Sequence, residues 1–177
     1  NMKQWLKLVE KIMFIFFGVC LGGYVAAHKY CIKIKVLRTE ISKWQFVVRL
    51  YDIWIMTKQH SQSIEDYLYN RGIKNIAIYG ASFLGTRLYY ELKKTGINVK
   101  YVLDKNTNVS LVGVDMRDPD HSSSKGIDAV IVTTLNSFDE VKNSLKTRGY
   151  RQVFALDEIL YDLMIRAQMT DCKESER

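Results

Sequence analysis

The chain contains few cysteines and histidines, and their positions exclude several classes of site. The three cysteines, Cys20, Cys31 and Cys172, lie far apart and not in CxxC spacing. The sequence therefore supports neither a disulfide framework nor a zinc site, and it fits a reducing compartment. The three histidines cluster neither with one another nor with the cysteines, so we expect no metal site. Hydrophobic residues make up 47% and charged residues 25%, a balance that excludes disorder and low-complexity sequence.

Acidic residues are scarce in the first 58 positions, and this scarcity is the origin of the net charge of +7. Residues 59–177 hold 16 basic and 16 acidic side chains, whereas residues 28–58 carry a net charge of +5 and residues 1–11 a net charge of +2. The positive charge thus flanks an apolar run instead of covering a globular domain. We therefore expect no nucleic-acid partner; the basic residues indicate membrane topology and can meet anionic lipid.

The apolar run covers residues 12–27 and contains no charge and no proline. A helix of this length spans about 24 Å, at roughly 1.5 Å per residue, and the side chains of Lys11 and Lys29 can reach the two interfaces. We predict a single membrane-spanning helix within residues 1–29. A cleaved signal peptide and a buried core helix are the alternatives. More Lys and Arg residues follow the run than precede it, which places the C-terminal part in the cytoplasm of a cell-membrane protein.

Residues 30–60 are predicted to continue as a helical stalk. Apolar residues recur there at alternating spacings of four and three, the a/d pattern of a coiled coil. Within the apolar run, Gly18 and Gly22 form a G-x-x-x-G pattern that lets two membrane helices approach closely. Both features predict a homo-oligomer. An intramolecular packing helix is the alternative, because the second half of the stalk is apolar on nearly every side. The a/d residues are Tyr30, Ile34, Leu37, Ile41, Trp44, Val48, Tyr51 and Ile55.

Residues 61–165 alternate between helical and extended patterns. Ser63 opens a capping box for a short helix, and longer helical patterns cover residues 84–95 and 138–148. Near-continuous apolar strands that alternate with helices are typical of a parallel sheet covered on both faces. We therefore predict a small, doubly wound, Rossmann-like α/β domain, followed by a polar C-terminal tail over residues 166–177. The strand-like runs, four of them preceded by a glycine, are residues 76–79, 99–103, 112–116, 129–134 and 153–156.

A candidate phosphate-binding loop, Gly-Ala-Ser-Phe-Leu-Gly at residues 80–85, follows the first strand and opens the next helix. Gly80 can make the tight turn, Gly85 lets helix and strand pack closely, and free N–H groups at the helix start can hold an anion. Ser82 replaces the middle glycine of G-x-G-x-x-G, so its side chain narrows the approach of a pyrophosphate while offering a hydroxyl. The predicted ligand-binding residues of the loop are Gly80, Ala81, Ser82, Phe83, Leu84 and Gly85.

Polar residues after two further strands complete the predicted site. Asp104 ends the second strand and can accept hydrogen bonds from ribose hydroxyls, which favours a ribose without a 2′-phosphate; a solvated loop acid is the alternative. Thr133 and Thr134 follow the central strand, where ligands bind in such sheets. Asn136 or Ser137 can join them, although capping of the next helix is the more favourable role for either.

The sequence shows no convincing catalytic constellation. No nucleophile–base pair or carboxylate dyad stands out. Tyr89 with Lys93, and Tyr90 with Lys94, match the Tyr-x-x-x-Lys spacing of short-chain dehydrogenases and epimerases, but they lie on a helix too early in the chain for that role. Arg87 on the same helix can reach a phosphate or form a surface salt bridge. Whether the chain is an enzyme stays open, and the sequence favours a non-catalytic protein.

These segments resemble a family of bacterial surface-polysaccharide proteins. Residues 76–85 (IAIYGASFLG), 101–104 (YVLD), 113–116 (GVDM) and 129–134 (AVIVTT) look like a small Rossmann-like domain. That domain occurs at the N-terminus of sugar acyltransferases with a left-handed β-helix and after the membrane helices of nucleotide-sugar dehydratases and epimerases. The resemblance implies that the loop contacts a nucleotide sugar, with Asp104 as the second-strand acid. In two departures, Phe83 replaces a further loop glycine, and no β-helix repeat follows residue 165.

Together these features predict a membrane-anchored cytoplasmic module that binds a nucleotide or nucleotide sugar. It would serve surface-polysaccharide synthesis as an accessory or regulatory partner of another enzyme. One alternative is an NAD-dependent enzyme of nucleotide-sugar metabolism that needs a partner to complete its site. Another is a ligand-free oligomeric scaffold in which Phe83 fills the pocket. Nucleotide sugar and NAD are the candidate ligands, and the sequence does not disclose the base, the sugar or the oligomeric state.

Overall fold

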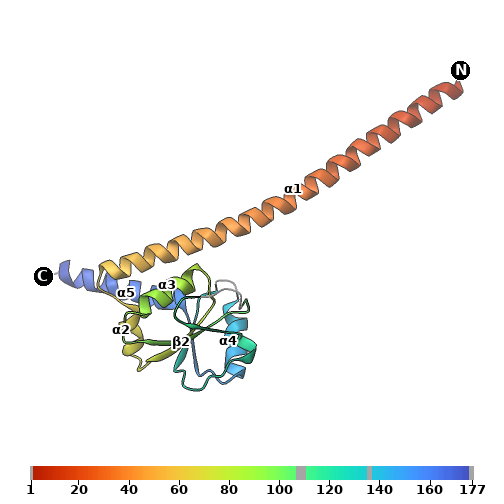
Figure 1. Ribbon diagram of the computed structural model, residues 1–177. Helices are drawn as coiled ribbons and strands as arrows, with labels where there is room; N and C mark the ends of the chain where they lie inside the picture. Colours follow the sequence, from red (N-terminus) through yellow and green to blue (C-terminus); the bar gives the residue numbers. More distant parts are fainter. Residues whose placement is uncertain (1, 107–110, 135–136, 176–177) are drawn as a thin grey trace. The chain divides into compact units, whose positions relative to one another are not determined.

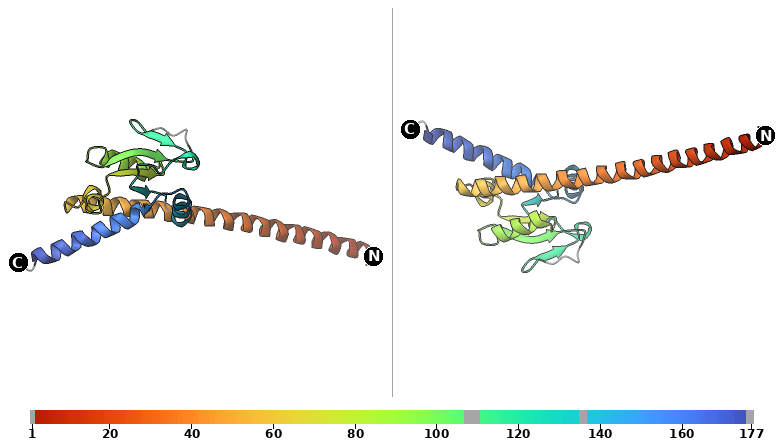
Figure 2. Two further views of the ribbon diagram at one scale, coloured as in Figure 1. Left: turned by 90° about the horizontal axis from the view of Figure 1, so that it is seen from below. Right: turned by 90° about the horizontal axis from the view of Figure 1, so that it is seen from above.

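The computed structural model describes residues 2–106, 111–134 and 137–175. The chain divides into two compact units, Asn1–Phe46 (unit 1) and Val47–Arg177 (unit 2). A single helix, α1 (Met2–Gln59), begins in unit 1 and ends in unit 2, so the expected membrane run and stalk belong to one continuous helix (Figure 2). The prediction of a long N-terminal helix is confirmed.

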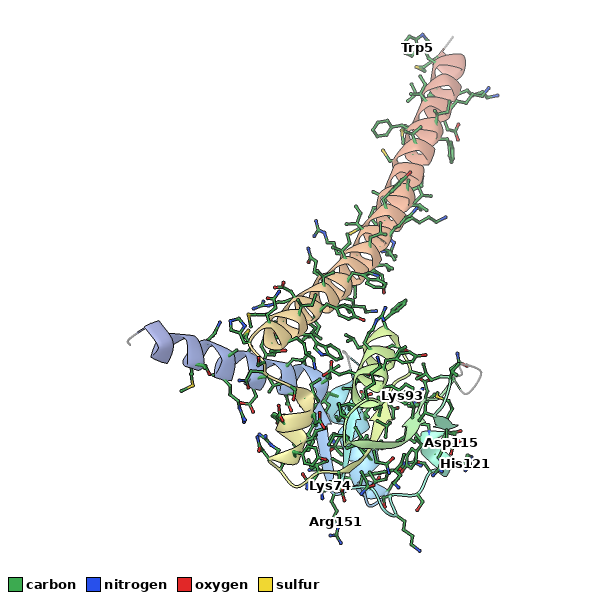
Figure 3. All side chains as sticks on the ribbon, turned by 60° about the vertical axis from the view of Figure 1, so that its left-hand side comes forward. Trp5, Lys74, Lys93, Asp115, His121 and Arg151 are labelled. Atoms are coloured by element: carbon green, nitrogen blue, oxygen red, sulfur yellow. The ribbon has the colours of Figure 1, made fainter. Side chains whose placement is uncertain are left out.

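The described residues of unit 1, 2–46, all belong to α1, and among them no second element packs on the helix (Figure 3). By length and composition α1 is able to cross a membrane, since its most apolar window has a mean hydropathy of 1.8 and is not buried in the structure. Helices of other kinds also pass this test, so membrane insertion and the coiled-coil stalk stay predictions.

Unit 2 is built on a five-stranded sheet in the order β3-β2-β1-β4-β5, and every neighbouring pair of strands is parallel (Figure 1). The strand order turns back at β1, because the chain adds β2 and β3 on one side of it and β4 and β5 on the other. The prediction of a small, doubly wound, Rossmann-like sheet is therefore confirmed. The strands are β1 (Asn75–Tyr79), β2 (Asn98–Leu103), β3 (Asp115–Arg117), β4 (Ala129–Val132) and β5 (Gln152–Ala155).

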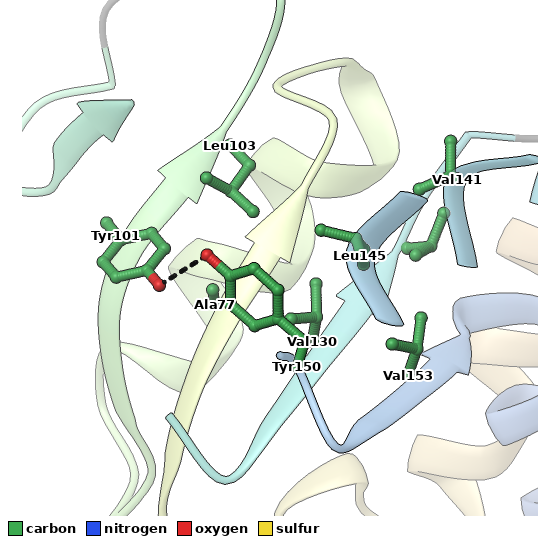
Figure 4. Close-up of a cluster of buried hydrophobic side chains, with 9 residues drawn as sticks. Ala77, Tyr101, Leu103, Val130, Val141, Leu145, Tyr150 and Val153 are labelled. Carbon is green, nitrogen blue, oxygen red and sulfur yellow. Dashed lines mark hydrogen bonds between the residues drawn. The ribbon is translucent and has the colours of Figure 1, made fainter. Parts of the chain in front are cut away.

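Helices cover both faces of this sheet, as near-continuous apolar strands require. Every residue of β4 is buried. Residues of β1 alternate between the faces: Ala77 packs in a cluster with Val141 and Leu145 of α4, which lies in front of the sheet in Figure 4, while α3 lies behind it. The helices are α2 (Ile64–Tyr69), α3 (Phe83–Leu92), α4 (Phe138–Thr147) and α5 (Leu156–Ser175), with one 3-10 turn, η1 (Pro119–His121).

Two of the expected strands differ from the structure by two residues or more at a boundary. The short strand expected over residues 112–116 is β3, which begins only at Asp115, because Gly113 adopts a left-handed φ of +91° and the chain turns there. The strand expected over residues 129–134 ends at Val132. The capping box that was predicted before α2 is present, since the hydroxyl of Ser63 accepts a hydrogen bond from the N–H of Asp66 at 3.0 Å.

The last turns of α1 belong to unit 2. Leu50, Ile53 and Trp54 are buried there, so the intramolecular packing proposed for the stalk holds for this face of the helix. Glu91 of α3 fixes the contact: one carboxylate oxygen accepts from the Trp54 indole N–H at 2.7 Å, and the other lies 2.6 Å from the Lys58 ammonium. The division between the units thus falls well before the domain boundary expected at residue 61.

The expected C-terminal tail, residues 166–177, begins inside α5, which continues to Ser175. Ala167 is buried, and the guanidinium of Arg166 pairs with the carboxylate of Asp162 at 2.9 Å. At least the start of this segment is therefore part of the packed domain, because its small apolar side chain contributes to the core.

Candidate functional site

A polar cavity in unit 2 lies at the carboxyl ends of β1, β2 and β4, where the strand order turns back. Parallel α/β sheets bind ligands at this place. The cavity has a volume of about 470 Å³. Two of its walls come from the loop after β1 and from α4, and a third comes from η1. Its lining residues are Tyr79, Gly80, Asp104, Lys105, Pro119, Asp120, Thr134, Ser137, Glu140, Val141 and Ser144.

The two glycines of the expected phosphate loop have the roles that their positions predicted. Gly80 adopts a φ of +101°, and its N–H donates to the carbonyl of Leu103 at 2.8 Å. A Cβ on Gly85 would overlap the carbonyl oxygen of Gly80, so only glycine allows α3 to approach the loop this closely. The hydroxyl of Thr133 lies 3.0 Å from the carbonyl oxygens of both Tyr79 and Gly80. These contacts tie the turn at Gly80 to the residue that follows β4.

None of the four loop residues between the two glycines, Ala81 to Leu84, is among the residues that line the cavity. Ser82 is the N-cap residue of α3, and its hydroxyl makes no capping hydrogen bond. Leu84 is buried in the core. Phe83 is 71% exposed and is not among the residues that line the cavity, so it does not fill the pocket as the scaffold alternative required. Arg87, also exposed, does not line the cavity either.

Asp104 joins the end of β2 to the phosphate loop. One of its carboxylate oxygens accepts from the N–H of Ala81 at 2.7 Å, and the other accepts from the N–H of Asn106 at 2.8 Å. Each oxygen keeps a further lone pair for a ligand hydroxyl. The carboxylate therefore lines the cavity with its position fixed by the backbone, as a ribose-binding acid would require.

A buried hydroxyl without a partner lies in the wall of the cavity. The Oγ1 atom of Thr134 is inaccessible to solvent and finds no hydrogen-bond partner among the described residues. Such a group costs free energy in the unliganded protein and recovers it when a ligand supplies the partner. Ser137 also lines the cavity and is the N-cap residue of α4, with no side-chain capping bond; Asn136 lies outside the described residues.

The third wall, η1, is held in place by residues that come after it in the chain. Arg148 donates to the carbonyl of Pro119 at 2.9 Å and pairs with the carboxylate of Asp120. The segment that follows η1 is also fixed. The hydroxyl of Tyr101 donates to the carbonyl of Ser123 at 2.6 Å and lies 2.9 Å from the hydroxyl of Tyr150 (Figure 4). These contacts fix η1 as a preformed part of the cavity.

The electrostatics of the cavity are dominated by carboxylates. Asp104, Asp120 and Glu140 all line it, whereas Lys105 is the one cation among the described lining residues and Arg148 pairs with Asp120. Burial, followed by the negative charges of Asp104 and Asp120, raises the pKa of Tyr79. The sequence reasoning identified Asp104 but missed Asp120, Glu140 and Ser144. The one local signal was the spacing of four between Glu140 and Ser144, which places both on one face of α4. Among the described residues no group of three or more His, Cys, Asp and Glu side chains is arranged to hold a metal.

No family model matches the chain. No curated protein matches it either. Solved structures similar to it include RSP, a Rex-family repressor, at 22% identity and a TM-score of 0.40, covering 47% of this chain and 44% of that one. RSP in complex with β-NADH matches at 19% identity and a TM-score of 0.40, over 63% of this chain and 72% of that one. RSP in complex with β-NAD+ and operator DNA matches at 19% identity and a TM-score of 0.39, over 58% and 60%.

These likenesses concern the fold alone, and the chain spans less than half the length of the first of these structures. They correct one expectation. A neutral charge balance over residues 59–177 was taken to exclude a nucleic-acid partner, yet one of the similar structures is in complex with operator DNA. The exclusion is therefore wrong.

Proposed function

We propose that unit 2 binds a ribonucleotide whose ribose lacks a 2′-phosphate, in the cavity at the carboxyl ends of β1, β2 and β4. The observation that carries this proposal is the Asp104 carboxylate, which lines the cavity and accepts a hydrogen bond from the N–H of Ala81, just before the N-terminus of α3. A diphosphate would lie at that N-terminus, because the partial positive charge of a helix start and its free N–H groups favour anions.

The lining of the cavity supports a hydroxyl-rich ligand. Carboxylates accept hydrogen bonds from sugar hydroxyls and repel additional phosphates. Thr134 supplies a buried hydroxyl that lacks a partner, and a ribose or a second sugar would provide one. NAD and nucleotide sugars both meet these requirements, whereas NADP places a phosphate next to Asp104.

We further propose that the chain is a membrane-anchored module with unit 2 in the cytoplasm, and that it regulates or assists another protein instead of catalysing a reaction. Support for the anchor comes from the apolar run at residues 12–27 in α1 and from the Lys and Arg residues around it. Surface-polysaccharide synthesis is the proposed setting, and it has the support of the sequence resemblance alone.

Thermal unfolding of the full chain in detergent micelles, with and without ligand, tests the binding proposal. The ligands are NAD+, NADH, NADP+, UDP and UDP-glucose. A ligand at 100 times its Kd stabilises the folded state by about 2.7 kcal/mol, so binding is easily measured. We expect stabilisation by at least one ribonucleotide and a weaker effect of NADP+ than of NAD+. No stabilisation by any of the five would overturn the proposal.

Two variants identify the site that is responsible. Asp104→Asn keeps an acceptor for the N–H of Ala81 but removes the charge, so it should weaken NAD+ binding and narrow the difference from NADP+. Asp115→Asn is the matched control, because Asp115 is an exposed acid that pairs with Arg117 and does not line the cavity. Equal effects of the two substitutions would show that binding does not use Asp104.

Membrane anchoring and orientation are tested in membranes from expressing cells. A spanning helix should leave the full chain in the pellet after carbonate extraction, and added protease should reach unit 2 only after the cytoplasmic face is opened. Release into the carbonate supernatant would contradict the anchor, and digestion from the outside would contradict the orientation.

A further inference from the structure

The a/d residues of α1 form an apolar seam, and all of them except the half-buried Tyr51 are exposed within their own unit. Within unit 1 the members of this seam are between 48% and 69% exposed, and within unit 2 Val48 and Ile55 are 65% and 59% exposed. A sustained apolar stripe of this length is unusual on a surface that meets only water. The seam members in unit 1 are Tyr30, Ile34, Leu37, Ile41 and Trp44.

The packing of α1 within unit 2 uses a different face of the helix. If Ile34, Ile41, Val48 and Ile55 are assigned to position a of a heptad, the buried residues Leu50, Ile53, Trp54 and Thr57 fall at positions c, f and g. Intramolecular packing therefore does not use up the seam. The question of what covers positions a and d remains after the domain is complete.

The residue types at these positions select the partner. Every a position holds a β-branched residue, which favours two parallel strands where leucine occupies position d; here Leu37 is the leucine at d, and the other d positions hold the aromatic residues Tyr30, Trp44 and Tyr51. At roughly 100 Å² of exposed area per side chain, the seven exposed members offer on the order of 700 Å² per copy, close to the ~800 Å² per partner of a standard interface. We propose that the seam binds the same seam of a second copy of this chain, as a parallel, in-register pair.

Lipid is a poorer occupant of the seam. A bilayer requires no alternation of spacings, and Lys33, Lys35, Arg38 and Lys43 lie between the seam residues, which keeps this stretch outside the hydrocarbon. In the parallel pair, Lys33 at position g would face Arg38 at position e of the other copy. Packing and not charge attraction then holds the two helices together, so the association should not weaken at high salt.

Disulfide cross-linking in membranes tests this pairing on the full chain. Cys20, Cys31 and Cys172 are first replaced by serine, and single cysteines are then introduced as Ile34→Cys and Val48→Cys. Disulfides require Cα atoms within about 7 Å, a separation that two a positions in register satisfy. The controls are Thr39→Cys at position f and Arg49→Cys at position b, both exposed and on other faces of the helix.

We expect disulfide-linked dimers at both seam positions, several-fold more abundant than at either control. Two seam positions are needed to distinguish a parallel from an antiparallel pair. In an antiparallel pair, at most one seam position would face the same position of the other copy, so only one of the two cysteines could form a disulfide. Cross-linking at only one seam position, or equally at all four sites, would overturn the proposal. So would seam cysteines that react with maleimide but form no dimer, or that cross-link only to a different protein.

A second measurement does not depend on cysteine chemistry. Ile41→Lys places a charge in the seam, whereas Thr39→Lys places the same charge two residues away at position f. Both side chains are exposed in unit 1, so neither change threatens the fold of unit 2. The mass of the particle in detergent should fall from dimer to monomer for Ile41→Lys alone, and an equal mass for both variants would contradict the seam. This outcome is independent of nucleotide binding, so the two proposals can fail separately.

Discussion

Replacement of Gly85 by alanine should destabilise unit 2, although the same change in most helices is favourable. Alanine is better than glycine in a helix interior by about 1 kcal/mol. At Gly85, however, the new Cβ would overlap the carbonyl oxygen of Gly80 and lie 3.1 Å from the hydroxyl of Thr133. The clash is with backbone, and that backbone is held by the hydrogen bond from the Gly80 N–H to Leu103 and by the hydroxyl of Thr133.

Relief of this clash requires α3 to move away from β1. Overpacking of this kind costs about 1–3 kcal/mol, and loss of the Thr133 hydrogen bond adds about 1 kcal/mol. After the gain in helix propensity is subtracted, we expect a net loss of about 1–3 kcal/mol. For a domain of this size the melting temperature should fall by about 4 °C for each kcal/mol lost.

Gly96→Ala is the matched control. Its new Cβ would meet the hydroxyl and two ring carbons of Tyr69 and no backbone atom; this side chain is 43% exposed and can turn away, so the stability should change by less than about 0.5 kcal/mol. Urea unfolding of the full chain in micelles, followed by tryptophan fluorescence, measures both variants. If Gly85→Ala proved as stable as the parent chain, the close approach of α3 to the loop would be refuted.

Three further predictions concern buried polar groups. Thr133→Val should lower the free energy of unfolding by about 1–3 kcal/mol because its hydroxyl serves two loop carbonyls, whereas Thr134→Val, whose Oγ1 has no partner among the described residues, should leave it unchanged or raise it; urea unfolding distinguishes them. Burial and the bond to Tyr150 raise the pKa of Tyr101, so its contribution to stability is complete below the unfolded pKa of about 10 and is lost as the pH rises above it; unfolding of Tyr101→Phe should depend less on pH in that range. Glu91→Leu should cost about 1–3 kcal/mol because the Trp54 indole loses its acceptor, whereas Glu91→Gln, which keeps one, should cost under about 1 kcal/mol; near-UV circular dichroism during unfolding compares them.

The elements of the sheet could be predicted because each strand is a short apolar run with a turn signal before it. Both faces of the sheet are covered at β4, so all four residues of this strand are buried. In the sequence they form one continuous apolar run. The roles of Gly80 and Gly85 were also accessible, since the position of a loop between strand and helix dictates where a Cβ cannot fit. Local pattern and backbone sterics were sufficient for these features.

The parts that escaped prediction depend on contacts between distant residues. Asp120 joins the cavity only because Arg148, 28 residues later, holds η1 in place. Trp54 could not be assigned to unit 2 from its neighbours, because its acceptor is Glu91 on α3. In both cases the sequence shows a polar or aromatic residue of ordinary type, and only the folded chain supplies the partner that gives it a role.

A charge average over the sequence also hides the local charge that folding produces. A net charge of zero over residues 59–177 describes an average, whereas a polyanion responds to the local field. Asp104, Asp120 and Glu140 gather at the carboxyl ends of the strands. A second cavity, of about 440 Å³, lies near the start of β1 and is lined by Lys100, Arg117 and Lys125. Folding has therefore separated the charges that the sequence average cancels, so the sign of the charge must be read site by site.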